Sequence, residues 1–173
     1  MGIVTIQCAE VQEAELIAAI SRQTFFDTFA GQNTKENMDK FLNEQFRMEM
    51  LVKEVGKEGN IFLLAKIDSE IAGYAFLRET ENPREMGNIP AIEVARIYAT
   101  QKNLGKGIGA ALMDKCIEIA RGMQKKLIWL CVWEHNLRAI DFYKKKGFER
   151  FGSHVFLLGD DPQNDWMMKK NLS

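Results

Sequence analysis

Residues 104–112 read Leu-Gly-Lys-Gly-Ile-Gly-Ala-Ala-Leu, and this glycine-rich stretch decides how the chain around it can fold. An apolar segment over residues 91–99 predicts a strand before it, and helical spacing of apolar residues predicts a helix after it, to about Gly122. Glycines at alternate positions let the backbone come close to a ligand and point successive N–H groups into one cavity. The free amides and the dipole of the helix start favour phosphate. The stretch therefore predicts a strand, loop and helix that accommodate a pyrophosphate.

The spacing of the glycines separates this loop from two common nucleotide sites. A Walker loop needs Lys-Ser or Lys-Thr after its last glycine, whereas two alanines follow Gly109. The relaxed dinucleotide fingerprint fits Gly105, Gly107 and Ala110, but that motif belongs on the first strand of its unit and needs an acidic residue about twenty residues later. Residues 124–126 are Gln-Lys-Lys. A helix start that binds no ligand is the alternative for the loop alone.

The segments before the loop predict helices followed by antiparallel strands. Hydrophobic periodicity predicts a strand over residues 3–8, helical spacing from Val11 to Phe25 and from Met38 to Phe46, and strands over 61–67, 71–77 and 91–99. Asp-Ser-Glu at residues 68–70 is a turn, so the strands on either side of it form a hairpin. Thr34 can cap the second helix.

The segments after the loop alternate between helix and strand. The pattern predicts a strand over residues 127–133, a helix over 136–146, a strand from Phe148, and a closing hairpin that joins 155–158 to 165–168. A crossover helix between neighbouring strands implies local parallel pairing. The sum is a mixed α/β sheet, expected to form one domain over residues 1–173.

The composition is that of an ordinary globular protein, with 46% hydrophobic and 27% charged residues among 173. The 23 basic and 24 acidic side chains leave a formal net charge of -1, which removes the usual electrostatic reason to expect a nucleic-acid partner. The first residues lack a secretory pattern, and no apolar run approaches membrane-spanning length. We therefore expect a cytoplasmic protein with no membrane partner.

Cysteine and histidine are too few and too scattered to predict a metal site. The three cysteines form no CxxC pair, and two histidines offer little material for a His-rich centre or a Ser-His-Asp triad. Cys131 could in principle carry an acyl group, but we interpret it as a core residue because direct transfer needs no such nucleophile. The residues concerned are Cys8, Cys116, Cys131, His135 and His154.

A second motif, residues 136–148, reads Asn-Leu-Arg-Ala-Ile-Asp-Phe-Tyr-Lys-Lys-Lys-Gly-Phe. Asn136 is placed to cap a helix, and Gly147 is placed to end it in a left-handed turn before the next strand. The two motifs together resemble those of the GNAT family of N-acetyltransferases. The second matches the family pattern of Asn, two residues, Ala, two residues, Phe-Tyr, three residues and Gly-Phe at every marked position. In the first, Leu104 stands where the family has Gln or Arg.

The resemblance implies a mixed, mostly antiparallel central sheet with splayed central strands and flanking helices. It also implies that the chain binds acetyl-coenzyme A. Main-chain groups of one strand would hold the pantetheine arm, the glycine loop would hold the pyrophosphate, and the second motif would complete the site. The cofactor-binding residues implied in this way are Ile97, Ala99, Leu104, Gly105, Lys106, Gly107, Ile108, Gly109, Ala110, Asn136 and Phe142.

Acetyl transfer needs a neutral amine and a proton source for the departing thiolate. The resemblance gives the proton-donor role to Tyr143, whose alternative is an aromatic residue at the core edge. Glu93 is the candidate base, because a carboxylate on the central strand could take the ammonium proton directly or through water. It could equally be a solvated residue or a charge partner of Arg96.

The acceptor site should come from the first half of the chain. Residues 24–42 resemble the N-terminal helices of PaiA-like acetyltransferases, which act on polyamines, so the acceptor implied is a small-molecule primary amine. Asp27, Glu36 and Asp39 could attract a polycation, or could simply be solvated. Acetylation of proteins or peptides and a non-catalytic acetyl-coenzyme A sensor are the alternatives, and a homodimer is left open.

Overall fold

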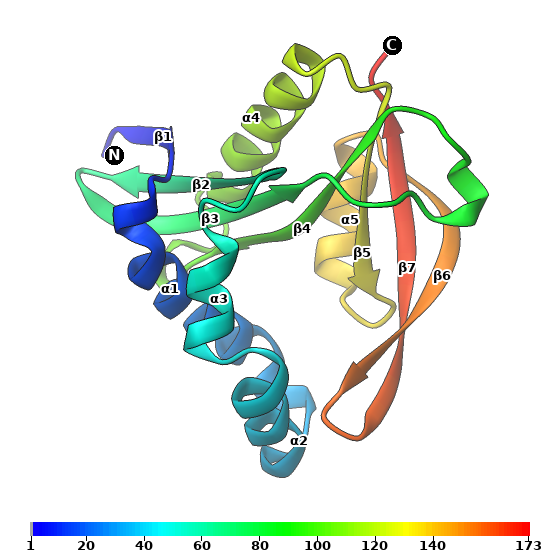
Figure 1. Cartoon of the computed structure of the whole chain (residues 1–173). Helices are drawn as coiled ribbons and strands as arrows, with labels where there is room; N and C mark the ends of the chain where they lie inside the picture. The colour runs from blue at the N-terminus through cyan, green and yellow to red at the C-terminus, as the bar shows by residue number, and fades with distance from the viewer. Residues whose placement is uncertain (1) are drawn as a thin grey trace.

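The computed structural model describes residues 2–173, whose strands form one seven-stranded sheet in the order β1-β2-β3-β4-β5-β7-β6 (Figure 1). Neighbouring strands are antiparallel except for β4 and β5, which are parallel. The strands are β1 (Val4–Cys8), β2 (Asn60–Ile67), β3 (Glu70–Arg78), β4 (Ala91–Ala99), β5 (Leu127–Trp133), β6 (Glu149–Leu158) and β7 (Asp161–Asn171). The fold is therefore the mixed, mostly antiparallel sheet that the sequence predicts.

Helices cover both faces of this sheet. They are α1 (Ala14–Phe29), α2 (Lys35–Lys40), the π-helical η3 (Phe41–Gln45), α3 (Met48–Glu54), α4 (Ile108–Gly122) and α5 (Leu137–Lys145). Alternation along β2 sets the two layers, because Leu63 packs in the cluster that contains α4 and α5, whereas Leu64 packs in the cluster that contains α1. Figure 1 shows α1 and α3 on one side of the sheet and α4 and α5 on the other.

The two central strands, β4 and β5, diverge. Their pairing runs from Ala91 with Leu127 to Glu93 with Trp129, although β4 continues to Ala99. A bulge accompanies the divergence, since the register of β3 against β4 shifts at Ala95. Figure 1 shows the ends of the two strands apart. The splayed central strands that the family resemblance implied are present, and they open a gap in the sheet.

Local signals explain where α2 begins and where α5 begins and ends. The Thr34 side chain accepts a hydrogen bond from Asn37 N and begins α2, and the Asn136 side chain accepts one from Ala139 N and begins α5. Gly147, with φ of 88°, follows the end of α5 in the left-handed conformation. The predicted caps are thus confirmed.

The structure corrects some of the predicted connections. Parallel pairing is confirmed across α4, but β5 and β6 are not neighbours, because the closing hairpin places β7 between them. The second predicted helix changes to π-helical turns over Phe41–Gln45 before it ends. Within residues 2–173, no helix combines the length and apolar character needed to cross a membrane. In the same range, no group of three or more His, Cys, Asp or Glu is arranged to hold a metal ion.

Candidate active site

A cavity of about 780 Å³ lies where β4 and β5 diverge. Its walls come from α5 and the start of α4 on one face of the sheet, from α1 on the other face, and from the strands β4, β5, β6 and β7. The cavity therefore passes through the gap in the sheet. Every site residue predicted from the sequence lines it except Lys106, and they are Glu93, Ile97, Ala99, Leu104, Gly105, Gly107, Ile108, Gly109, Ala110, Asn136, Phe142 and Tyr143.

The glycine loop fits a pyrophosphate. Gly105 and Gly107 have φ of 77° and 83°, a conformation that other residues rarely adopt. Gly107 is the N-cap of α4, and a Cβ at this position would meet nothing within 4 Å. The first N–H groups of α4 have no partner within the helix, so they are free for an anion in the open space above the loop.

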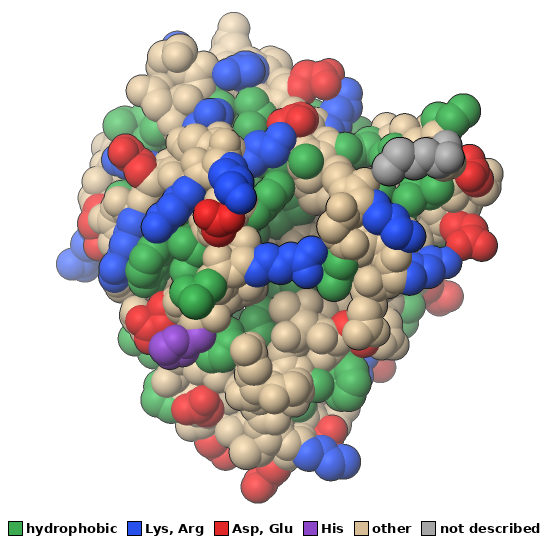
Figure 2. Space-filling model, turned by 180° about the vertical axis from the view of Figure 1, so that it is seen from behind, with side chains coloured by type: hydrophobic (Ala, Val, Ile, Leu, Met, Phe, Trp, Pro, Cys, Tyr) green, Lys and Arg blue, Asp and Glu red, His purple; other side chains and the backbone are tan. Residues whose placement is uncertain are grey.

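Two side chains near the loop differ from expectation. Lys106 does not line the cavity, and its Nζ donates to Asn103 Oδ1 at 3.3 Å. Arg138 does line it, and its Nη2 lies 3.9 Å from where a Cβ on Gly105 would be. The second motif contained Arg138 as an unmarked position, so the fold was needed to bring it to the loop. Figure 2 shows Lys and Arg side chains gathered near a hollow on the face that carries α4 and α5.

Tyr143 lies in α5 and lines the cavity. Its side chain is buried, and its ring packs 5.3 Å from Phe142 and 5.9 Å from Phe148, measured between centroids. Burial raises the pKa of the Tyr143 hydroxyl, because the phenolate would lose its hydration. The hydroxyl therefore keeps its proton at neutral pH, as a proton donor must. It is at once a core-edge aromatic and a cavity residue, so the two interpretations are compatible.

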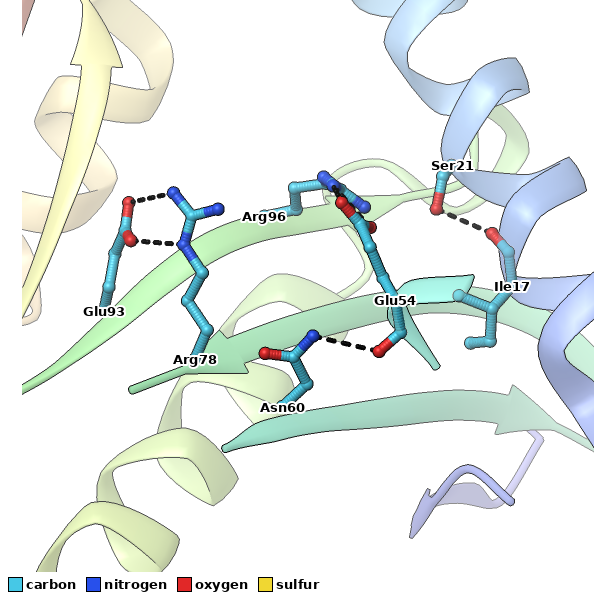
Figure 3. Close-up of polar contacts among 7 residues, drawn as sticks. All are labelled: Ile17, Ser21, Glu54, Asn60, Arg78, Glu93 and Arg96. Atoms are coloured by element: carbon cyan, nitrogen blue, oxygen red, sulfur yellow. Dashed lines mark hydrogen bonds and ion pairs between the residues drawn. The ribbon is translucent and has the colours of Figure 1, made fainter. Parts of the chain in front are cut away.

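Glu93 is buried and held by an arginine other than the expected one. Arg78 Nε donates to Glu93 Oε2 at 2.6 Å and Arg78 Nη2 donates to Oε1 at 3.2 Å (Figure 3). Arg96 instead pairs with Glu54 at the end of α3, with Nη2 2.7 Å from Oε2. Glu93 is thus neither solvated nor the partner of Arg96. Glu93 and Arg96 stand three positions apart on β4, about 10 Å along the strand, and each pairs with a residue of another element.

The face of the cavity under α1 carries acidic and aromatic groups. Asp27 lines it, whereas Asp39 forms an exposed ion pair with Lys35 and Glu36 is exposed, so of the three predicted acidic residues Asp27 is the one at the site. Asp165 lines it from β7, and burial raises the pKa of its carboxyl to about 6. Sequence reasoning missed Asp165, because it lies in a hairpin without a recognisable motif.

Cys131 also lines this face but is not a nucleophile in its resting state. Burial, followed by the charges of Glu93 and Asp165, raises the pKa of its thiol to about 12. The thiolate, which is the reactive form, is therefore scarce at neutral pH. The arrangement favours direct transfer between two bound substrates.

Known proteins are similar to this chain in both sequence and fold. The model of the acetyltransferase (GNAT) family matches residues 21–148. An uncharacterized N-acetyltransferase from Lactobacillus delbrueckii subsp. lactis is 39% identical over 171 residues, covering 99% of this chain and 98% of the relative. A spermidine N(1)-acetyltransferase from Thermoplasma acidophilum is 25% identical over 174 residues, with 96% of each chain covered. The crystal structure of PaiA N-acetyltransferase from Thermoplasma acidophilum in complex with coenzyme A superposes with a TM-score of 0.79 at 21% identity, covering 98% of this chain and 99% of that chain.

Proposed function

The chain belongs to the acetyltransferase (GNAT) family and is an acetyl-coenzyme A-dependent N-acetyltransferase, and from this premise we propose that it moves the acetyl group directly onto a primary amine of a small molecule. A polyamine such as spermidine or spermine is the acceptor class that we infer. The observation that carries the proposal is the single cavity that joins the glycine loop to an acidic face under α1.

Each group of cavity residues has a separate role in the proposed reaction, set by its position in the site. When bound, acetyl-coenzyme A supplies the acetyl group as a thioester. The loop from Gly105 to Ala110 offers backbone amides to the pyrophosphate, and the β4 backbone at Ile97 and Ala99, unpaired with β5, offers hydrogen bonds to an extended arm. Tyr143 donates its proton to the departing thiolate. Glu93 is the base predicted from the sequence, but Arg78 engages both of its oxygens, which makes it a weak proton acceptor.

Two observations support a polyamine acceptor. A relative named spermidine N(1)-acetyltransferase covers nearly the whole chain. The acceptor face, which is the face of the cavity under α1, also carries Asp27 and Asp165, and carboxylates on a cavity wall attract cations. Phe29 and Trp133 lie edge to face beside them with centroids 6.2 Å apart, which gives the methylene chain of a polyamine an apolar wall.

An acceptor screen that follows release of free thiol tests the proposal. Spermidine and spermine are compared with monoamines, amino acids and lysine-containing or N-terminal peptides, each with acetyl-coenzyme A. We expect the polyamines to be acetylated fastest. Faster turnover of peptides would replace the acceptor class with a protein one, and tight coenzyme binding without turnover of any amine would make the chain a sensor.

Tyr143→Phe tests the proton donor. The variant keeps the ring packing and loses the hydroxyl, so we expect kcat for the best acceptor to fall by about a hundredfold or more. Coenzyme A affinity, measured by calorimetry, should stay within about twofold because the backbone loop is untouched. Turnover equal to that of the parent enzyme would remove Tyr143 from the mechanism.

A further inference from the structure

Asp165 lies on the acceptor face. In the sheet it stands between Trp133 on β5 and His154 on β6, and all three line the cavity. Cys131 and Glu93 line the same face, and the charge of Asp165 acts on the thiol of Cys131 and the hydroxyl of Tyr98. The carboxylate therefore faces the gap between β4 and β5, where the two substrates must meet.

The Asp165 carboxylate is free. Among residues 2–173 it takes part in no side-chain hydrogen bond and no ion pair, while the neighbouring carboxylate of Glu93 is held at both oxygens by Arg78. A carboxylate locked in a bidentate pair with a guanidinium has no oxygen left to receive an ammonium group and is a weak proton acceptor. Between Glu93 and Asp165, Asp165 is thus the better placed to receive an amine.

Charged and titratable groups surround Asp165 from each packed element. His154 faces it from β6, Glu134 follows β5, Cys131 lies on β5 and Tyr98 lies on β4. Asp27 lines the same cavity from α1. Burial is the main cause that raises the pKa of Asp165 to about 6, a nearby charge at Glu134 raises it further, and His154 opposes them. A base with a pKa near the working pH is efficient, because it is mostly ionised and still holds the proton that it takes.

We propose that Asp165 binds the ammonium group of the acceptor and takes its proton before the nitrogen attacks the thioester. The inference rests on the proposed acetylation of an amine and names the residue that receives it. One proton passes from the ammonium to Asp165, the N–C bond forms as the C–S bond breaks, and the thiolate takes the proton of Tyr143. The second proton of the nitrogen restores Tyr143, and Asp165 releases its proton to solvent, so that one proton leaves per turnover.

The test compares Asp165→Asn with Glu93→Gln, using the best acceptor from the screen and thiol release between pH 5 and 9. We expect kcat/KM of the parent enzyme to rise through a limb near pH 6. Asp165→Asn should lose this limb and about a hundredfold or more of kcat/KM, whereas Glu93→Gln should keep the limb. Asp161→Asn, an exposed residue of the same strand, is the matched control and should behave as the parent.

Two further measurements separate a loss of folding from a loss of the base. Coenzyme A affinity by calorimetry shows whether the variants remain folded, and His154→Gln should move the limb to higher pH, because His154 lowers the pKa of Asp165. A limb that survives in Asp165→Asn, or that disappears in His154→Gln, overturns the inference and leaves the acetyltransferase intact. A parent enzyme that acetylates no amine at all overturns the proposed function, and this inference with it.

Discussion

Leu104 stands where the family pattern has Gln or Arg, and its side chain is 47% exposed at the cavity. The Arg138 guanidinium, from the first turn of α5, lies against the same loop on the side of Gly105. A guanidinium suits a pyrophosphate because its planar fork donates two parallel hydrogen bonds. We therefore expect Arg138 to make the side-chain contact that Leu104 cannot make.

Arg138→Ala should lower coenzyme A affinity by about tenfold or more, the typical worth of a hydrogen bond to a charged group. Calorimetric titration of coenzyme A measures the effect. Lys102→Ala removes an exposed cation near the loop that already pairs with Glu70, so it controls for the general loss of positive charge and should change affinity little. Equal losses in the two variants would contradict a specific role for Arg138.

The helices α1 to α3 form the cover of the acceptor face, and one ion pair ties α3 to the central strand. Glu54 at the end of α3 pairs with Arg96 on β4 (Figure 3). The Arg96 guanidinium also lies over the rings of Phe46 and Phe76, at 4.9 Å from each centroid. These contacts join the helical cover to the sheet.

Arg96→Ala should lower the free energy of unfolding by about 2–3 kcal/mol, because it leaves Glu54 without its partner and removes the contacts with both rings. Urea unfolding followed by circular dichroism measures the change. Lys35→Ala, which breaks an exposed ion pair with Asp39 on α2, is the control and should cost less than about 0.5 kcal/mol. An Arg96→Ala variant as stable as the control would show that the pair does not hold the cover.

Short-range signals account for what the sequence predicted about these elements. The caps at Thr34 and Asn136 and the glycines at the start of α4 depend on hydrogen bonds and dihedral angles within a few residues, so their effect can be inferred from the chain alone. The partners of Glu93 and Arg96 depend on strand register, on a bulge and on the docking of α3. Asp165 reaches the site because β7 inserts next to β5, and no local pattern encodes that order.

At the scale of the whole molecule, the partly buried charge of Asp165 lowers the free energy of unfolding at neutral pH. A carboxylate at Asp165 is partly desolvated without a compensating cation, and burial raises its pKa from 3.8 to about 6. A raised carboxyl pKa means that the folded state holds the proton more tightly than the unfolded state. The free energy of unfolding should therefore fall as pH rises from about 4 to about 6 through this group.

Asp165→Asn mimics the neutral carboxyl and should be more stable than the parent enzyme at pH 7.5. We expect a gain on the order of 1 kcal/mol, allowing for screening by solvent at a partly buried group. The gain should shrink toward pH 4, where the parent carboxyl is itself neutral. Urea unfolding at the two pH values measures it, and a gain that does not change with pH would assign the effect to packing.

The gap between β4 and β5 separates the glycine loop, which we propose holds the coenzyme, from the acidic face under α1, which we propose holds the acceptor. The acceptor and acetyl-coenzyme A can thus enter from opposite sides of the sheet and meet at the gap, so that neither blocks the entry of the other. We therefore expect that the acetylated product is able to leave while coenzyme A is still bound. Because strand pairs are missing between β4 and β5, the site can be reached from both faces of the sheet.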